Sequence, residues 1–387
     1  RLVVEATVDN RSDQPIVLPV PGGDTTVDRA DLSLAFGNGA DDDWTGNIVV
    51  RELRTTQFSA AEARFDLGGL ARNIDRPDLR SITFAVDGLL SGIVATRADI
   101  DAALGDEITL DIDGSWNAGQ PVRLANAILS GNGLAVSLQG DIADFAFNGD
   151  IGVQTESIAP FSGLAGRNLT GALDLSANGE VRPITGAFDL TIDSAAQDLR
   201  IGIDAADNLL AGRTTIAGRV ARGEEGLTAE GLRVGNDRIA LNANGTIASG
   251  AADFGYDLAL SDLALVSPQA EGRLEANGRA VGADGTITLT SLARVPEGRL
   301  VGRRLTDAQI AFEGVLQDGA LDGTIGGDAF LDGVRAQLSA GVAVADGERR
   351  LTDLDFSTRG ARATGSLTQG AAGLIDGRIV IDAPDIS

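Results

Sequence analysis

Ile108-Thr109-Leu110-Asp111-Ile112-Asp113 is a stretch in which apolar and polar residues alternate without a break. Side chains of a β-strand point to opposite faces in turn, so this stretch predicts a strand with one aliphatic face and one polar face. The same alternation recurs from Phe188 to Asp193 and from Phe254 to Ser261, and similar runs fill most of the 387 residues. We therefore expect an all-β protein, built as an elongated, repetitive, solenoid-like sheet.

One short module recurs along the chain. Leu134 to Ile142, Leu173 to Val181 and Ile239 to Ile247 share the predicted order strand, Gly turn, strand, with a loose spacing between copies. No shift in composition and no linker separates the copies. The pattern predicts one continuous, degenerate array over residues 1–387 in which each unit stacks on its neighbours.

Glycine makes up 51 residues, and many glycines follow Asn or Asp. Such pairs supply the positive φ angles of tight hairpins, so we expect turns at strand ends. These predicted turns are Asn38-Gly39, Asn178-Gly179, Asn244-Gly245, Asn277-Gly278, Asp284-Gly285, Asp318-Gly319 and Asp322-Gly323.

Helical patterns are scarce. Ser59 to Leu70 and Thr96 to Leu104 are compatible with short helices or irregular strands. Asp207 to Gly212 and Ala159 to Arg167 predict turns or single helical turns.

The composition restricts the chemistry. The chain contains no Cys, His, Met or Lys, which excludes thiolate and imidazole metal ligands, a thiol nucleophile and a Ser-His-Asp triad. We expect no enzyme, no catalytic residue, no metal and no cofactor. The net charge of −25 disfavours nucleic acid as a partner. Because the chain begins at Arg1 and lacks Met, we also expect it to be an internal piece of a longer protein.

Three groups of residues have a structural and a functional interpretation. The Asp-rich stretches Gly39 to Asp43 and Gly326 to Gly333 suit Ca²⁺, but single copies are more typical of hairpin turns. Trp44 and Trp116 are candidates for stacking against a sugar ring, yet isolated Trp residues more often pack as anchors at strand ends. The pairs Arg303-Arg304 and Arg349-Arg350 suit phosphate head groups, although we favour solvated edge charges.

The aliphatic face itself leaves two alternatives open. Two sheets can close on each other around a dry core, or the sheet can stay open so that its aliphatic face forms a groove. Alternation alone does not separate these arrangements.

Three stretches carry a family resemblance. They are Gly152 to Leu173, which includes Ile158-Ala-Pro-Phe-Ser-Gly-Leu-Ala-Gly-Arg167, then Pro183 to Leu190, and Leu209 to Gly218. They resemble the TamB family, inner-membrane-anchored envelope proteins of the AsmA-like group. The family's membrane anchor and its segment that contacts a barrel partner are not recognisable in this chain, so the resemblance implies an interior section.

The resemblance implies a β-taco, a folded-over sheet whose aliphatic interior forms a groove for phospholipid acyl chains. The implied groove-lining residues are Leu110, Leu134, Val136, Leu138, Leu173, Leu175, Phe188, Leu190, Ile192, Ile201, Ile203, Ile239, Leu241, Leu258 and Leu260. The implied protein partner, reached through the full-length protein, is the outer-membrane barrel TamA.

We therefore expect a periplasm-spanning section that shields lipid during transport between the two membranes and supports outer-membrane protein and autotransporter assembly. The implied location is the periplasm of a Gram-negative envelope, with the anchor outside this chain. The first alternative is an extracellular β-solenoid adhesin or passenger-like structural protein, for which Ca²⁺ is a candidate ligand. A more distant one is a carbohydrate-active β-helix that uses a pair of Asp residues.

Overall fold

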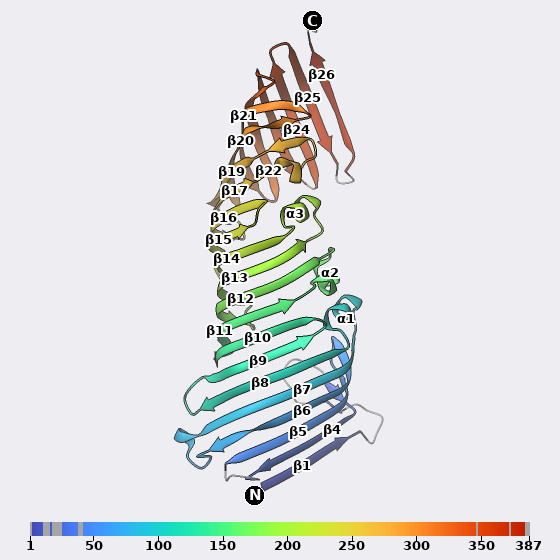
Figure 1. The fold of residues 1–387 in the computed structure, drawn as a ribbon, viewed down its shortest axis with the longest axis vertical. Coiled ribbons are helices and arrows are strands. Elements are labelled where there is room, and N and C mark those ends of the chain that lie inside the picture. The colour runs from blue at the N-terminus through green and yellow to red at the C-terminus, as the bar shows by residue number, and fades with distance from the viewer. Residues whose placement is uncertain are drawn as a thin grey trace. The chain divides into compact units, whose positions relative to one another are not determined.

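A computed structural model describes residues 2–10, 16–17, 25–37, 42–345, 347–370 and 373–383. The chain divides into two compact units, Arg1–Gly202 and Ile203–Ser387, and each is described by itself. Both consist almost entirely of antiparallel strands, which confirms the all-β, repetitive fold class (Figure 1).

In unit 1 the strands follow one another with few interruptions. The elements are β1 (Leu2–Asp9), β2 (Ile16–Val17), β3 (Thr26–Val27), β4 (Arg29–Phe36), β5 (Asp43–Arg54), β6 (Phe58–Arg72), η1 (Pro77–Leu79), β7 (Ser81–Ala95), α1 (Ala98–Leu104), β8 (Glu107–Asn117), β9 (Val122–Gly131), β10 (Leu134–Ala143), β11 (Ala146–Thr155), η2 (Ala159–Phe161), α2 (Ser162–Ala165), β12 (Thr170–Arg182) and β13 (Ala187–Arg200).

Unit 2 repeats this organisation after one short helix. The elements are α3 (Asp204–Leu209), β14 (Arg213–Gly223), β15 (Gly226–Gly235), β16 (Ile239–Ala248), β17 (Ala251–Leu260), η3 (Leu263–Leu265), β18 (Ala270–Gly272), β19 (Leu274–Ala283), β20 (Thr286–Leu300), β21 (Arg303–Gln317), β22 (Ala320–Leu331), β23 (Val334–Ala345), β24 (Glu348–Thr358), β25 (Ala361–Gln369) and β26 (Ile375–Asp382).

Almost every strand pairs with the next strand in the chain. From β4 to β13 each strand turns back and lies antiparallel beside its predecessor, including the pairs β7–β8 and β11–β12, which α1 and α2 connect (Figure 1). The exceptions are local: β1 pairs with β4, β3 with β5, β17 with β19 and β18 with β20. Each strand therefore depends mainly on its immediate neighbours in sequence.

Only some of the predicted glycine turns are turns. Asp284-Gly285 and Asp318-Gly319 form two-residue hairpins with positive φ at both residues, as the type I′ geometry requires. The prediction was wrong for four other pairs, which lie inside strands; these are Asn178-Gly179, Asn244-Gly245, Asn277-Gly278 and Asp322-Gly323. For the same reason each copy of the recurring module is one continuous strand, in β10, β12 and β16, and contains no turn. Asn38-Gly39 lies outside the described residues.

Glycine inside the strands allows close approach of neighbouring backbones. Gly140 of β10 lies opposite Gly149 of β11, and a Cβ added at Gly149 would lie 2.6 Å from the Gly140 Cα. Gly179, the next residue in this row, has φ +148°. Since only glycine tolerates both the contact and that φ, these residues determine the local backbone geometry of the sheet.

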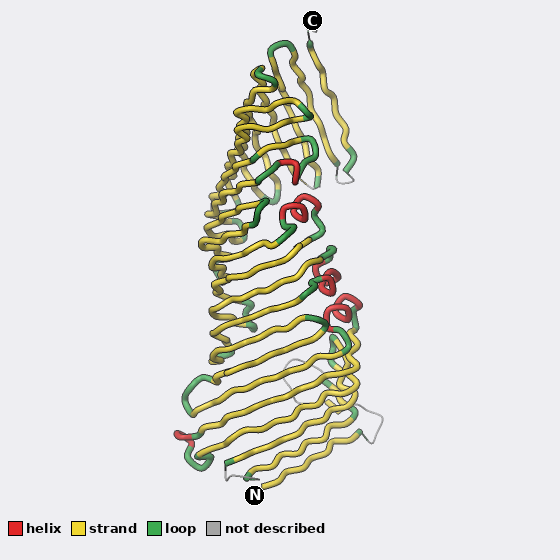
Figure 2. Tube along the Cα trace, viewed as in Figure 1, coloured by secondary structure: helices red, strands yellow, loops and turns green. Residues whose placement is uncertain are grey.

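The short helices lie at the ends of the strands, where they connect one strand to the next. Ser59 to Leu70, for which a helix was one alternative, belongs to the regular strand β6, whereas Thr96 to Leu104 contains α1. In unit 1, α1 and α2 contact each other at one end of the strands, and η1 lies at the opposite strand ends (Figure 2).

Buried residues in this sheet are few and small. Most of the buried apolar residues are alanines, such as Ala63, Ala177 and Ala243, while the larger aliphatic side chains around them are mostly half-buried. Three small clusters form around Val50, Phe147 and Val295. Among the described residues, the core is a thin layer on one face.

Candidate functional site

A row of apolar side chains crosses unit 1 in register. Each member lies directly opposite the next on the neighbouring strand, so all of them share one face of the sheet. From β4 to β12 the row is Leu32, Ile48, Phe65, Gly88, Leu110, Leu129, Val136, Val153 and Leu175. The opposite face carries the matching polar row Ser33, Asn47, Asp66, Asp87 and Asp111 from β4 to β8.

This aliphatic face is accessible. Leu32 is 38% exposed and Leu129 is 44% exposed, while Val136, Val153 and Leu175 are half-buried. Side chains interlocked in a dry core between two sheets would be almost fully buried. The burial pattern therefore describes an aliphatic surface on which an apolar ligand can lie.

The strand register places most of the predicted lining residues together. Nine of them share the aliphatic face of unit 1, namely Leu110, Leu134, Val136, Leu138, Leu173, Leu175, Phe188, Leu190 and Ile192. In unit 2, Ile239 lies opposite Leu260 and Leu241 opposite Leu258, so these four also share a face. Ile201 and Ile203 follow the end of β13 and belong to no strand; Ile203 is the N-cap residue of α3.

Unit 2 contains an apolar cavity that the sequence analysis missed. Its volume is about 270 Å³, close to the lower end of known ligand pockets. Its aliphatic lining comes from η3 and from β18 to β24, and includes Leu263, Leu274, Val295, Leu305, Ala329 and Leu331. None of the predicted groove residues lines it. Gln309 and Asp328 also border the cavity, but strand alternation directs their side chains to the opposite face.

The η3 helix forms one wall of this cavity, and the Asp262 carboxylate caps it. The Asp262 side chain accepts hydrogen bonds from the Ala264 N–H at 3.0 Å and from the Gly272 N–H at 2.9 Å. It thereby caps η3 and ties it to β18, which places Leu263 over the sheet. The sequence signal is Asp262-Leu-Ala-Leu265, a capping residue followed by an apolar run.

Charged side chains stand at the edge of the cavity near the β20–β21 turn. Leu300, which lines the cavity and is 40% exposed, lies opposite Arg303. The Arg303 Nε donates to Asp332 Oδ2 at 2.8 Å, and the Arg304 backbone N–H donates to Asp332 Oδ1 at 2.9 Å. Both interactions stabilise the carboxylate and hold the pKa of Asp332 below its usual range.

Two of the remaining candidate residues, Asp332 and Trp44, make structural contacts. Asp332 of the second Asp-rich stretch is held by Arg303 in a hairpin turn, and part of the first stretch lies outside the described residues. Among the described residues, no cluster of acidic side chains is arranged to hold a metal ion. The Trp44 indole N–H donates to the Thr83 carbonyl at 3.2 Å, which links the start of β5 to β7 across β6 of the same sheet.

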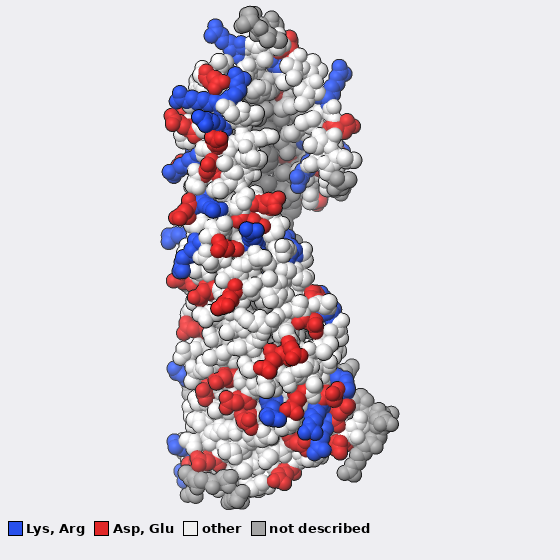
Figure 3. Space-filling model, turned by 45° about the vertical axis from the view of Figure 1, so that its right-hand side comes forward, with Lys and Arg blue, Asp and Glu red and all other residues white. Residues whose placement is uncertain are grey.

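Acidic and basic side chains are interspersed over the surface visible in Figure 3. Several ion pairs join an Arg to an acid two residues away on the same strand, as in Arg29–Asp31 and Arg64–Glu62. Residues two apart share a face, so these pairs lie on one side of the strand. Exposed pairs of this kind are screened by water and contribute little to stability.

Comparison of the chain with family models, with curated proteins and with solved structures finds no match. In the described part of the chain, no helix has the length and apolar character needed to cross a membrane.

Proposed function

We propose that this chain is an interior section of a TamB-like envelope protein that shields lipid acyl chains on its aliphatic face. The observation that carries the proposal is the in-register apolar row from Leu32 to Leu175, which remains partly exposed across nine strands. An alkyl chain laid across it gains about 0.8 kcal/mol for each methylene removed from water.

The uniform aliphatic composition of this face favours a ligand that moves along it from strand to strand. The row contains aliphatic residues, one Phe and one Gly, and the charged residues of the strands lie on the opposite face. A lipid tail therefore meets similar contacts at each strand and no single deep site that would retain it. The cavity of unit 2 offers a more enclosed site of the same chemistry.

The proposed place of the protein is the periplasm, between the inner membrane and the outer membrane. Support for outer-membrane protein assembly with the barrel TamA belongs to the same proposal and rests on the resemblance of Gly152 to Gly218 to the TamB family. In this arrangement the section carries no catalytic group, and its role is to keep lipid tails from water.

Site-specific photocrosslinking tests the lipid proposal. A photoreactive residue at Val136 or Leu175, in chain mixed with phosphatidylethanolamine vesicles, is expected to capture phospholipid. The neighbouring positions Ser137 and Asp174 point to the polar face and serve as controls. Equal capture at the control positions would show that lipid does not select the aliphatic face.

A matched pair of charge variants provides an independent test. Leu175→Arg places a cation on the aliphatic face, whereas Ser176→Arg places the same charge on the adjacent, exposed polar position. We expect Leu175→Arg to lower the amount of phospholipid bound at least tenfold and Ser176→Arg to leave it unchanged. Similar binding by both variants would contradict the proposal.

A further inference from the structure

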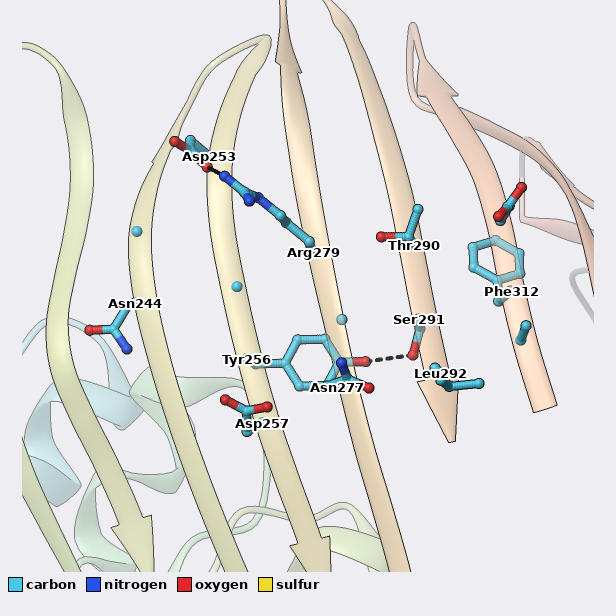
Figure 4. A pocket seen from close by; sticks show the side chains of 15 residues that line it. Asn244, Asp253, Tyr256, Asp257, Asn277, Arg279, Thr290, Ser291, Leu292 and Phe312 are labelled. Atoms are coloured by element: carbon cyan, nitrogen blue, oxygen red, sulfur yellow. Dashed lines mark hydrogen bonds and ion pairs between the residues drawn. The ribbon is translucent and has the colours of Figure 1, made fainter. Parts of the chain in front are cut away.

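Each unit carries a recess on its polar face, opposite the aliphatic face. In unit 2 the recess has a volume of about 750 Å³ and crosses β16, β17, β19, β20 and β21 (Figure 4). Three consecutive residues of each of the strands β19, β20 and β21 line it, and the first and third of each three lie on the polar face. On β19, for example, Asn277 and Arg279 lie on the polar face and Gly278 lies on the aliphatic face. This pattern shows that the recess opens on the polar face.

A missing side chain opens the recess. Gly255 lies on the polar face of β17, and a Cβ added there would meet only the Gly278 carbonyl oxygen, at 3.7 Å. Polar side chains from β17 itself and from both adjacent strands surround this position; Asp257, Asn244 and Asn277 are seen in Figure 4. The space above Gly255 therefore has a polar wall and a backbone floor.

The wall offers hydrogen-bond donors and acceptors together. Arg279 neutralises Asp253 at 2.9 Å. The Asn244 Oδ1 accepts the Gly231 N–H at 2.6 Å, which directs its NH₂ group elsewhere as a donor. Asp257 adds a carboxylate acceptor, and Asn277 adds an amide that both donates and accepts.

Unit 1 carries a second recess of the same chemistry. It has a volume of about 540 Å³ and crosses β9 to β13, with Gly152 among its lining residues. Its wall consists of amides, hydroxyls and carboxylates, including Asn126, Gln139, Ser176, Asn178 and Asp193. The Asn178 amide donates to Asp150 at 2.7 Å. The polar recess is thus a repeated feature of the fold.

We propose that these polar recesses bind a neutral glycan. Planar amide and carboxylate groups form paired hydrogen bonds with adjacent hydroxyls, and a sugar supplies hydroxyls that donate and accept. Neighbouring strands are about 4.8 Å apart, which is close to the length of one sugar residue in a linear chain. A glycan lying across the strands therefore meets one set of polar side chains per residue.

Other ligand classes fit these recesses less well. Asp257 and Glu313 leave the unit 2 recess with an excess of negative charge, which opposes phosphate and nucleic acid. The polar wall offers little to an alkyl chain. An organic cation is the main competitor, because it would pair with the same two carboxylates.

Hydrogen exchange on the full chain, with and without millimolar cellotetraose, tests the proposal. We expect protection of the β17 and β19 amides that persists in high salt. Gly255→Gln fills the recess and Asn277→Ala removes an amide from its wall, so both should abolish the protection. Ala259→Gln, on the same face of β17 but outside the recess, should retain it.

Two results would overturn the proposal. One is protection by spermidine, lost in high salt, without any protection by cellotetraose, which would assign the recess to organic cations. The other is unchanged cellotetraose protection in Gly255→Gln. Lipid capture at Leu175 concerns the other face, so the two proposals fail or succeed independently.

Discussion

The ring of Tyr256 on β17 lies across the backbone of Gly278 on β19, where the two residues face each other in the register. A Cβ at Gly278 would lie 2.7 Å from the Tyr256 Cζ, and the Tyr256 hydroxyl hydrogen-bonds to Ser291 Oγ at 3.0 Å one strand further on (Figure 4). Phe65 and Gly88 form the same kind of pair in unit 1. An aromatic ring thus covers each of these strand glycines.

Gly278→Ala should displace the Tyr256 ring and break its hydrogen bond to Ser291. Overpacking of this kind typically costs about 1–3 kcal/mol, so we expect a lower midpoint in urea unfolding. The control is Gly326→Ala, because a Cβ at Gly326 would meet nothing within 4 Å and its φ is not positive. Equal destabilisation by both variants would show that the ring contact is not the cause.

Gly149→Ala should be more damaging than Gly278→Ala. Its new Cβ would lie 2.6 Å from the Gly140 Cα, and backbone has less freedom to move than an aromatic ring. We expect a loss of at least about 3 kcal/mol, at the upper end of overpacking effects. Hydrogen exchange should accelerate first in β10 and β11, and exchange that accelerates equally in β4 and β5 would contradict this local explanation.

Val301→Asn should stabilise unit 2. Val301 occupies the left-handed region at φ 51° in the β20–β21 turn, a conformation that β-branched residues disfavour. The corresponding residue in the β21–β22 turn is Asp318, at φ 52°. We expect a gain of about 1 kcal/mol from Val301→Asn and a similar loss from Asp318→Val. The prediction fails if urea midpoints move in the opposite directions.

Ala329→Leu should fill the apolar cavity of unit 2. Ala329 lines this cavity and is only half-buried, so the added atoms have space to enter it. We expect binding of the fluorescent fatty acid cis-parinaric acid to fall about tenfold, or about 1.4 kcal/mol. Ala320→Leu, at an exposed position on the opposite face of β22, is the control and should bind normally.

The Arg303–Asp332 pair should give stability that depends on pH. The folded-state pKa of Asp332 is lowered, so its contribution is present above the unfolded value of about 3.9 and is lost as the pH falls through the lower folded value. Asp332→Asn should therefore lower the urea midpoint at pH 7 and have little effect near pH 2. In an Arg303→Gln background the effect at pH 7 should shrink, which a double-mutant cycle measures.

Alternation predicted the strands and their faces because a half-buried sheet imposes a period of two. It also contained a signal against the wrong turns. The apolar residues stay at odd-numbered positions on both sides of Gly179, as shown by Leu173, Leu175, Ala177 and Val181. A two-residue turn would instead separate two strands whose alternation patterns are independent of each other. Asn-Gly pairs are therefore insufficient to predict a hairpin when the alternation continues through them.

The remaining differences arise where tertiary contacts override local pattern. The alanines of Ser59 to Leu70 favour helix locally, but cross-strand pairing with β5 and β7 makes this segment a strand. The apolar cavity was missed because Asp307, at φ 53°, interrupts the β21–β22 register and shifts which side chains share a face. Such shifts follow from three-dimensional pairing and leave little trace in the sequence.

Pairing between consecutive strands affects how this protein folds during synthesis and how its sequence can evolve. Each hairpin can add to the sheet soon after it leaves the ribosome, since its partner has just been synthesised and little loop closure is required. Where consecutive strands pair in this way, removing or duplicating one hairpin leaves the pairings among the remaining strands intact. The number of strands in each unit can therefore change during evolution in steps of one hairpin.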